Sequence, residues 1–384
     1  MLYLLVKKNL IWLTAHKIGF LRVFTFVTFQ AIVAVMISFL LVYLLAPGVI
    51  RWLRAQKIGD NAKSDQAEID ILNSGKQGTP TMGGILINLA VLFTIALLAD
   101  LSNFYVQMAM VCVAILGAVG AVDDWLKLTR DRRGETGRQG LTSLEKLLAQ
   151  IWLATVLAYF TYHYGRNLEE HNRLYFPFVK NFHEYSIVLG PLAFVILSSL
   201  VMIGSSNAVN LTDGMDGLAS GCMAITGFTF IVLAIIVGVS DNANFLNFPY
   251  IPASGQMAVI AGAITGACLG FLWFNCYPAS VFMGDTGSLA LGGLIGYIAI
   301  VIRQELMLVI VGGVFVFEAL SVMMQVLYFK YTRKRYGEGR RIFLMAPVHH
   351  HFQKLGWQEP KIVVRFWLIN AMLAAMALAT TKLR

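Results

Sequence analysis

The chain has 384 residues, of which 58% are hydrophobic and only 13% are charged, and its mean hydropathy is +0.69. These values lie outside the usual range of soluble globular domains and exclude that class. The net charge of +9 could suit a nucleic-acid binder, but charge that sets membrane topology or attracts anionic lipid headgroups explains it more simply, and we expect no nucleic-acid partner.

Apolar runs long enough to cross a bilayer recur along the whole chain. A helix needs about 20 residues to span a hydrocarbon core of roughly 30 Å. No linker or repeat divides the chain, so we expect one all-α polytopic membrane domain over residues 1–384, with 1–20 as an N-terminal extension that lacks a signal-peptide cleavage site. The ten predicted transmembrane helices are 21–50, 82–100, 104–123, 144–164, 186–206, 217–239, 254–274, 287–302, 305–329 and 362–381.

Basic residues indicate the orientation of these spans. Three loops on one side of the predicted membrane, 51–80, 123–147 and 330–361, hold most of the 30 lysines and arginines. The positive-inside rule places these loops in the cytoplasm and both termini in the periplasm. The four cysteines have no paired or metal-like spacing, and we expect small buried side chains rather than disulfides.

The third apolar run ends in the segment "VDDWLK", which contains Asp123, Asp124 and Lys127. Two carboxylates at the C-terminal end of a helix oppose the helix dipole, and the neighbouring bilayer penalises their charge. The pair could be interfacial charges that Lys127 neutralises at helical spacing, or it could belong to a functional site. This segment alone does not separate the two interpretations.

Two later cytoplasmic segments add more polar groups. In "NAVNLTDGMDGLASG", Asn207, Asn210, Asp213 and Asp216 recur every three residues and would line one drifting face if the stretch were helical. Asp and Asn form helices poorly, which favours function over solubility. In "FNCYPASVFMGDTGSLALGG", Asn275 and Asp285 precede the eighth span, where Asp285 could simply cap that helix.

The remaining candidates lie in basic, glycine-rich or histidine-rich stretches. "SGKQGTPTMGG" places Lys76 and Thr81 at the mouth of the second span, although an ordinary turn would look similar. "MAPVHHHFQ" holds His349, His350 and His351, which cannot all face one ion from a regular helix and therefore favour contacts to phosphate or sugar oxygens. Gln325 and Glu318 share a face of the ninth span; we favour Gln325 for function, while Glu318 could simply bond a neighbouring helix.

Taken together, these loops gather five carboxylates at one membrane face of a chain that has only 21 acidic residues. Mg²⁺ is usually held by one or two carboxylates together with water and substrate phosphates. A metal at such a site neutralises charge during phosphoryl transfer. The residues therefore predict a Mg²⁺-dependent enzyme that acts on phosphorylated substrates.

Five segments in the same order resemble the phospho-N-acetylmuramoyl-pentapeptide transferase family of bacterial peptidoglycan synthesis. The wider superfamily of polyprenyl-phosphate N-acetylhexosamine-1-phosphate transferases shares the aspartate motifs, whereas "GTPTMGG" and "HHHF" resemble this branch in particular. The likeness runs from about residue 21 to the C-terminus, with Gln353 where the family often has Glu. The segments are "GTPTMGG" (78–84), "VDDWLK" (122–127), "NAVNLTDGMDGLA" (207–219), "FMGDTGSLALGG" (282–293) and "MAPVHHHF" (345–352).

The resemblance implies a homodimer in the bacterial inner membrane with a cytoplasmic, Mg²⁺-dependent active site. The implied reaction converts UDP-MurNAc-pentapeptide and undecaprenyl phosphate to lipid I and UMP. It implies Asp285 as metal ligand, Asp123, Asp124 and His349 as further catalytic groups, and Phe282 as a stacking partner for uracil. The implied substrate-binding residues are Lys76, Thr81, Lys127, Asn207, Asn210, Asp213, Asp216, Asn275, Phe282, Gln325, His350 and His351.

Three alternatives stay open from the sequence. We prefer a single displacement in which Asp123 accepts the proton of the lipid phosphate, but a covalent phospho-aspartate intermediate would use the same residues. A sister transferase for UDP-N-acetylglucosamine would share the aspartates. An ion-coupled transporter would fit the hydropathy, although transporter sites tend to lie at the membrane midplane, whereas these carboxylates lie at the cytoplasmic ends of the spans.

Overall fold

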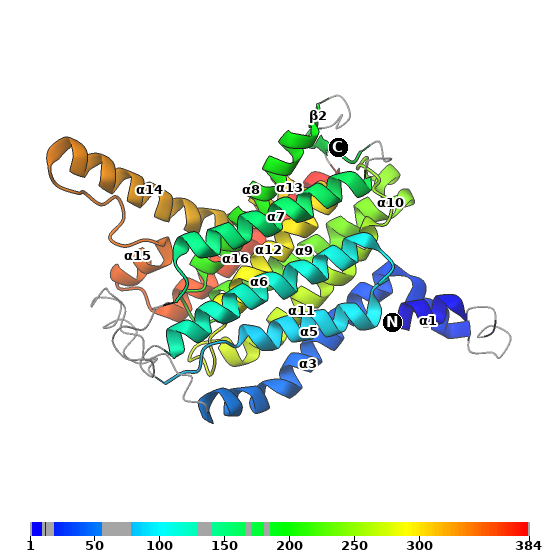
Figure 1. Ribbon diagram of the computed structural model, residues 1–384, viewed down its shortest axis with the longest axis horizontal. Coiled ribbons are helices and arrows are strands. Elements are labelled where there is room, and N and C mark those ends of the chain that lie inside the picture. Colours follow the sequence, from blue (N-terminus) through cyan, green and yellow to red (C-terminus); the bar gives the residue numbers. More distant parts are fainter. Residues whose placement is uncertain are drawn as a thin grey trace.

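The fold is seen in a computed structural model, which describes residues 2–9, 12, 19–55, 78–129, 140–165, 170–179 and 185–382. It is an α-helical bundle with a single two-stranded antiparallel hairpin in these segments, β1 (Arg173–Leu174) with β2 (Ile187–Val188). Long helices run side by side along the bundle, and both termini lie at the end opposite α15 (Figure 1).

Each predicted span overlaps one of the long helices, although several helix ends differ by several residues from the prediction. The long helices are α3 (Val27–Ala55), α5 (Gly84–Leu98), α6 (Phe104–Leu128), α7 (Ser143–Gly165), α8 (Pro191–Thr212), α9 (Leu218–Gly238), α11 (Met257–Asn275), α12 (Gly284–Val301), α14 (Gly313–Tyr336) and α16 (Glu359–Ala379). The short helical elements are α1 (Leu2–Lys8), η1 (Gly19–Thr25), α10 (Ser240–Phe245), η4 (Ser254–Gln256), α13 (Glu305–Val311), α15 (Val348–Lys354) and η5 (Thr380–Lys382).

Eight of the helices in the described segments are long and apolar enough to cross a membrane. Of the ten predicted spans, α5 has only 15 residues, and α7 is not among those eight. The chain is therefore a multi-pass membrane protein, as the hydropathy predicted.

The predicted span 305–329 is wrong in detail because the helix is interrupted at Gly312. The structure divides this segment into α13 and α14, and α14 continues to Tyr336, seven residues beyond the predicted end. Figure 1 shows α14 projecting away from the bundle. Only 22% of its most apolar window is buried within the protein. Hydropathy alone could not reveal this break, since apolar residues lie on both sides of it.

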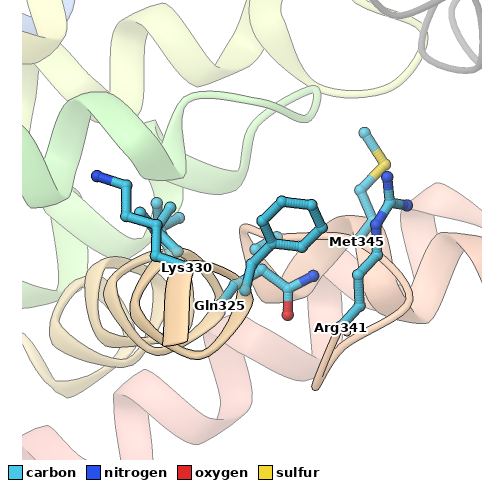
Figure 2. Close-up of a pocket in the computed structure, with 8 residues that line it drawn as sticks. Gln325, Lys330, Arg341 and Met345 are labelled. Atoms are coloured by element: carbon cyan, nitrogen blue, oxygen red, sulfur yellow. The ribbon is translucent and has the colours of Figure 1, made fainter. Parts of the chain in front are cut away.

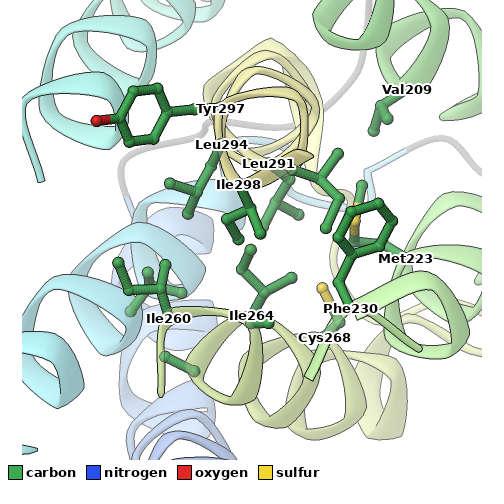
Figure 3. Close-up of a cluster of buried hydrophobic side chains, with 14 of the residues drawn as sticks. Val209, Met223, Phe230, Ile260, Ile264, Cys268, Leu291, Leu294, Tyr297 and Ile298 are labelled. Carbon is green, nitrogen blue, oxygen red and sulfur yellow. The ribbon is translucent and has the colours of Figure 1, made fainter. Parts of the chain in front are cut away.

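The centre of the bundle is formed by α9, α11 and α12. Of the apolar window in α12, 89% is buried, so neighbouring helices surround it on all sides. Leu291, Leu294 and Ile298 of α12 face Ile264 of α11 and Phe230 of α9 in one apolar cluster (Figure 3). Because lipid solvates apolar side chains as well as a protein core does, close packing rather than water exclusion holds such helices together. This rigid centre carries the N-terminal end of α12, where Asp285 lies.

Candidate active site

Three aspartates from two helices meet at one end of the bundle. Asp123 and Asp124 lie in the last turns of α6, and Asp285 lies in the first turn of α12. One carboxylate oxygen from each lies within 4.8 Å of the others. The two backbones approach closely because Gly120 of α6 has no side chain, and a Cβ there would lie only 2.2 Å from the carbonyl oxygen of Asp285. The convergence predicted from separate loops is therefore present.

Asp124 closes the N-terminal end of α12. Its Oδ2 accepts hydrogen bonds from the backbone N–H of Thr286 at 2.9 Å and from the Thr286 hydroxyl at 2.6 Å, and its Oδ1 accepts from the N–H of Asp285 at 3.2 Å. Unpaired N–H groups and the helix dipole both favour an anion at this position. The alternative that Asp285 caps its own helix is wrong, because Asp285 is already inside the helix and Asp124 supplies the cap.

Two lysines bridge Asp123 and Asp285. The Nζ of Lys127 lies 2.6 Å from Asp123 Oδ2 and 3.2 Å from Asp285 Oδ2. The Nζ of Lys146, in the first turns of α7, lies 3.1 Å and 2.9 Å from the same two oxygens. From the sequence, Lys146 counted only as one of the basic residues that orient the loop 123–147. Nothing in the sequence around it predicts that its side chain reaches the aspartates.

Polar side chains of α8 complete one side of the cluster. Asn210 donates to Asp285 Oδ1 at 2.8 Å and to the Ser288 hydroxyl at 2.9 Å. Asp213 follows directly after α8, and burial raises the pKa of its carboxyl well above the usual range, with the negative charges of Asp285 and Asp124 acting in the same direction. Burial and the neighbouring carboxylates thus both favour the neutral form of Asp213 beside the cluster.

Asn207 and Asp216 do not share this wall with Asn210. Asn207 donates to Gln150 Oε1 of α7 at 2.8 Å. Asp216 accepts from the N–H of Ala279 at 2.9 Å. The predicted single face of four polar groups is not formed, because α8 ends at Thr212 and the following turn redirects the later residues.

Other predicted residues lie in the loops that flank the cluster. Thr81 lies beside Gly284 and close to the Asp124 carboxylate. A Cβ added at Gly284 would lie 3.0 Å from Thr81 Oγ1 and 2.6 Å from Asp124 Oδ2. Phe282 is half-buried, and its N–H donates to the carbonyl of Pro80 at 2.8 Å. Asn275 is buried and accepts from the N–H of Gly217 at 3.1 Å. Lys76 lies outside the described residues.

The three histidines of α15 have different surroundings. Nδ1 of His349 lies 3.1 Å from Glu318 Oε2 of α14, and both side chains are fully buried. His350 Nδ1 lies 3.0 Å from Gln353 Oε1. His351 Nδ1 accepts from the N–H of Leu344 at 3.1 Å. The three imidazole rings therefore have three different neighbours.

Gln325 organises a separate pocket along α14. Its Oε1 accepts from the N–H groups of Ile342 and Phe343, both at 3.0 Å, and it thereby holds the chain that follows the helix. This segment and α14 enclose a pocket of about 290 Å³ (Figure 2). The pocket is lined by Val322, Gln325, Val326, Phe329, Lys330, Arg341, Met345 and Ala346.

A multi-pass membrane protein with a lysine-bridged carboxylate cluster at one end of its bundle has the features of a membrane enzyme for phosphorylated substrates. The sequence model described as Glycosyl transferase family 4 matches residues 106–303, and signature 1 of the phospho-N-acetylmuramoyl-pentapeptide-transferases matches residues 76–87. A phospho-N-acetylmuramoyl-pentapeptide-transferase of Desulfotalea psychrophila is 45% identical over 94% of this chain and 96% of its own length. The chain belongs to the phospho-N-acetylmuramoyl-pentapeptide-transferase family, which confirms the resemblance seen in its motifs.

Proposed function

We propose that this protein transfers phospho-MurNAc-pentapeptide from UDP-MurNAc-pentapeptide to undecaprenyl phosphate, giving lipid I and UMP. The site would face the cytoplasm of the bacterial inner membrane, with ten spanning helices, both termini in the periplasm, and a homodimer as the working unit. The observation that carries this proposal is the cluster of Asp123, Asp124 and Asp285 in a chain of this family.

The donor set of the cluster fits Mg²⁺. Carboxylate oxygens are the ligands that this hard cation prefers. Asp285 would hold the ion, with Asp123 and Asp124 close enough to share its charge, because one carboxylate oxygen from each lies within 4.8 Å of the others. When bound, Mg²⁺ supplies charge neutralisation for the pyrophosphate and the leaving phosphate.

The reaction requires two phosphate anions to approach each other. Lys127 and Lys146 lie where they can pair with incoming phosphate oxygens and lower that repulsion. An oxygen of the lipid phosphate attacks the β-phosphorus of the UDP-sugar, the pyrophosphate P–O bond breaks, and UMP leaves with the bonding electrons. Asn210 would keep Asp285 oriented through its 2.8 Å hydrogen bond during this exchange.

Asp123 is the proposed proton acceptor if the lipid phosphate arrives protonated. Two ammonium groups and the N–H of Leu141 hold its carboxylate in the structure. Protonation would cost these ion pairs, so we place the transfer after the substrate phosphates have drawn the lysines toward themselves. His350, Phe282 and Gln325 are proposed to contact the sugar nucleotide, whereas His349 is fully buried between Glu318 and Gly214.

The decisive experiment measures UMP release by the purified protein in detergent with undecaprenyl phosphate and Mg²⁺. We expect rapid release from UDP-MurNAc-pentapeptide and none from UDP-N-acetylglucosamine. Preference for the second nucleotide would assign the chain to the sister activity instead. Labelled phospho-sugar retained on the protein without lipid would replace the single displacement with a covalent intermediate.

A further inference from the structure

A buried pair of ionisable residues, Glu318 and His349, lies outside the carboxylate cluster. Glu318 Oε2 lies 3.1 Å from His349 Nδ1 and accepts weakly from the backbone N–H of His349 at 3.5 Å. Both side chains have 0% exposure. Among the described residues, Glu318 Oε1 and both ring nitrogens of His349 lack a partner in hydrogen-bonding geometry, so Oε2 and Nδ1 are held at an ion-pair distance. A carboxylate held without solvent inside a membrane protein is costly, so this pair has a cost in stability.

The carboxylate favours one orientation of the imidazole. A carboxylate attracts the N–H side of an imidazole ring, here the side of Nδ1, which lies 3.1 Å from Glu318 Oε2. Nε2 is the other ring nitrogen. It is buried and has no hydrogen-bond partner in the described part of the chain.

The free nitrogen faces the turn that connects α8 to α9. A Cβ added at Gly214 would lie 2.4 Å from His349 Nε2, so the imidazole packs directly against the backbone of this turn. The preceding residue is Asp213, whose pKa is raised first by burial and then by the negative charges of Asp285 and Asp124. Contacts therefore lead from α14 through His349 to Gly214, the residue next to Asp213.

We infer that Glu318 is a positioning residue for the proposed transferase reaction: it orients His349, and the oriented imidazole sets the position of the Asp213–Gly214 turn beside the carboxylate cluster. The inference rests on the proposed function for its kinetic consequence. Its packing consequence is independent of that function. Glu318 itself contacts no part of the cluster.

The first test compares two replacements of Glu318 by their rates of UMP release. Glu318→Gln keeps an oxygen that can accept the Nδ1 proton, whereas Glu318→Leu removes it. We expect kcat to fall by about 10- to 100-fold in the leucine variant, the usual cost of losing the partner that orients a functional histidine, and to stay within about threefold of the parent in the glutamine variant. Wild-type rates in the leucine variant, or equal losses in both, would overturn the inference.

The second test measures how His349 packs against the turn through the melting temperature, and it does not depend on enzyme activity. Gly214→Ala should lower the melting temperature of the detergent-purified protein by a few degrees, because the new Cβ meets the imidazole. In a His349→Ala background the same substitution should cause no further shift. An equal shift in both backgrounds would contradict the contact between turn and imidazole. Gly204→Ala is the matched control, since an added Cβ there has no atom within 4 Å.

These two tests separate failure of the inference from failure of the proposed reaction. If the parent protein releases no UMP from UDP-MurNAc-pentapeptide, the transferase proposal fails. The melting temperatures of the Gly214→Ala and His349→Ala variants then still decide whether His349 supports the turn. If the parent is active and Glu318→Leu is fully active, only the positioning role of Glu318 is lost.

Discussion

At the scale of single residues, the site depends on carboxylates that pair with the same two lysines. Asp285 Oδ2 forms ion pairs with Lys127 and Lys146, and Asp285 Oδ1 accepts a hydrogen bond from Asn210. The sequence predicted the aspartates because charged groups at the ends of apolar spans are costly and need a reason. It could not predict Lys146, because nothing in the local pattern distinguishes it from the other basic residues of the same loop.

The Asp285→Asn substitution should nearly abolish UMP release, with a loss of about 10³-fold, because it removes one charge of the proposed metal site and one partner of both lysines. The Mg²⁺ concentration needed for half-maximal rate should rise. Asp241→Asn is the control, since Asp241 is exposed on α10. Full activity of the Asp285 variant would remove this residue from the metal site.

The Lys146→Met substitution should lower kcat by roughly 10²-fold, because methionine keeps much of the side-chain volume but cannot pair with phosphate or carboxylate oxygens. A steady-state rate measurement in detergent checks this expectation. The matched variant Lys334→Met removes an exposed charge from α14 and should behave as the parent. If both variants were equally active, Lys146 would be only a structural partner of Asp123.

At the scale of helices, backbone proximity places the aspartates. The long apolar runs could be predicted because hydropathy reports burial in lipid or protein. The ends of α8 and the interruption at Gly312 could not, since they follow from turns and packing rather than from composition. The orientation of Asn207 toward α7 was missed for the same reason.

The crossing of α6 and α12 should tolerate no side chain at Gly120. Gly120→Ala would push the new Cβ against the Asp285 carbonyl, and the overpacking should cost roughly 1–3 kcal/mol and displace Asp285. We expect a lower melting temperature together with reduced UMP release. The Gly204→Ala variant, with open space at its Cβ, should match the parent in both measurements. Unchanged stability at position 120 would show that the helices can separate without cost.

At the scale of the whole molecule, the proposed topology puts the aspartate cluster and the termini on opposite sides of the membrane. Figure 1 shows both termini at the end of the bundle away from α15. The sequence alone predicts this orientation, because the basic loops concentrate on one side of the predicted spans. The sequence does not predict which helices pack against one another, since nearly every apolar run would suit either lipid or protein neighbours.

Thiol labelling of cells tests this topology. In a Cys276→Ser background, which removes the exposed native thiol, Asp241→Cys should react with a membrane-impermeant reagent from the periplasm. Glu338→Cys, just after α14, should react only after the inner membrane is permeabilised. The opposite pattern would invert the orientation and place the site outside.

The Asp124 side chain both caps α12 and belongs to the carboxylate cluster. The same two oxygens that lie beside Asp123 and Asp285 also terminate α12, so its replacement would unravel a helix end and disturb the reaction centre together. Even asparagine would turn an NH₂ group toward N–H donors that need an acceptor. Inactivity after such a replacement would therefore be no proof that Asp124 touches a substrate, whereas Asp285 and Lys146 can be altered without losing this cap.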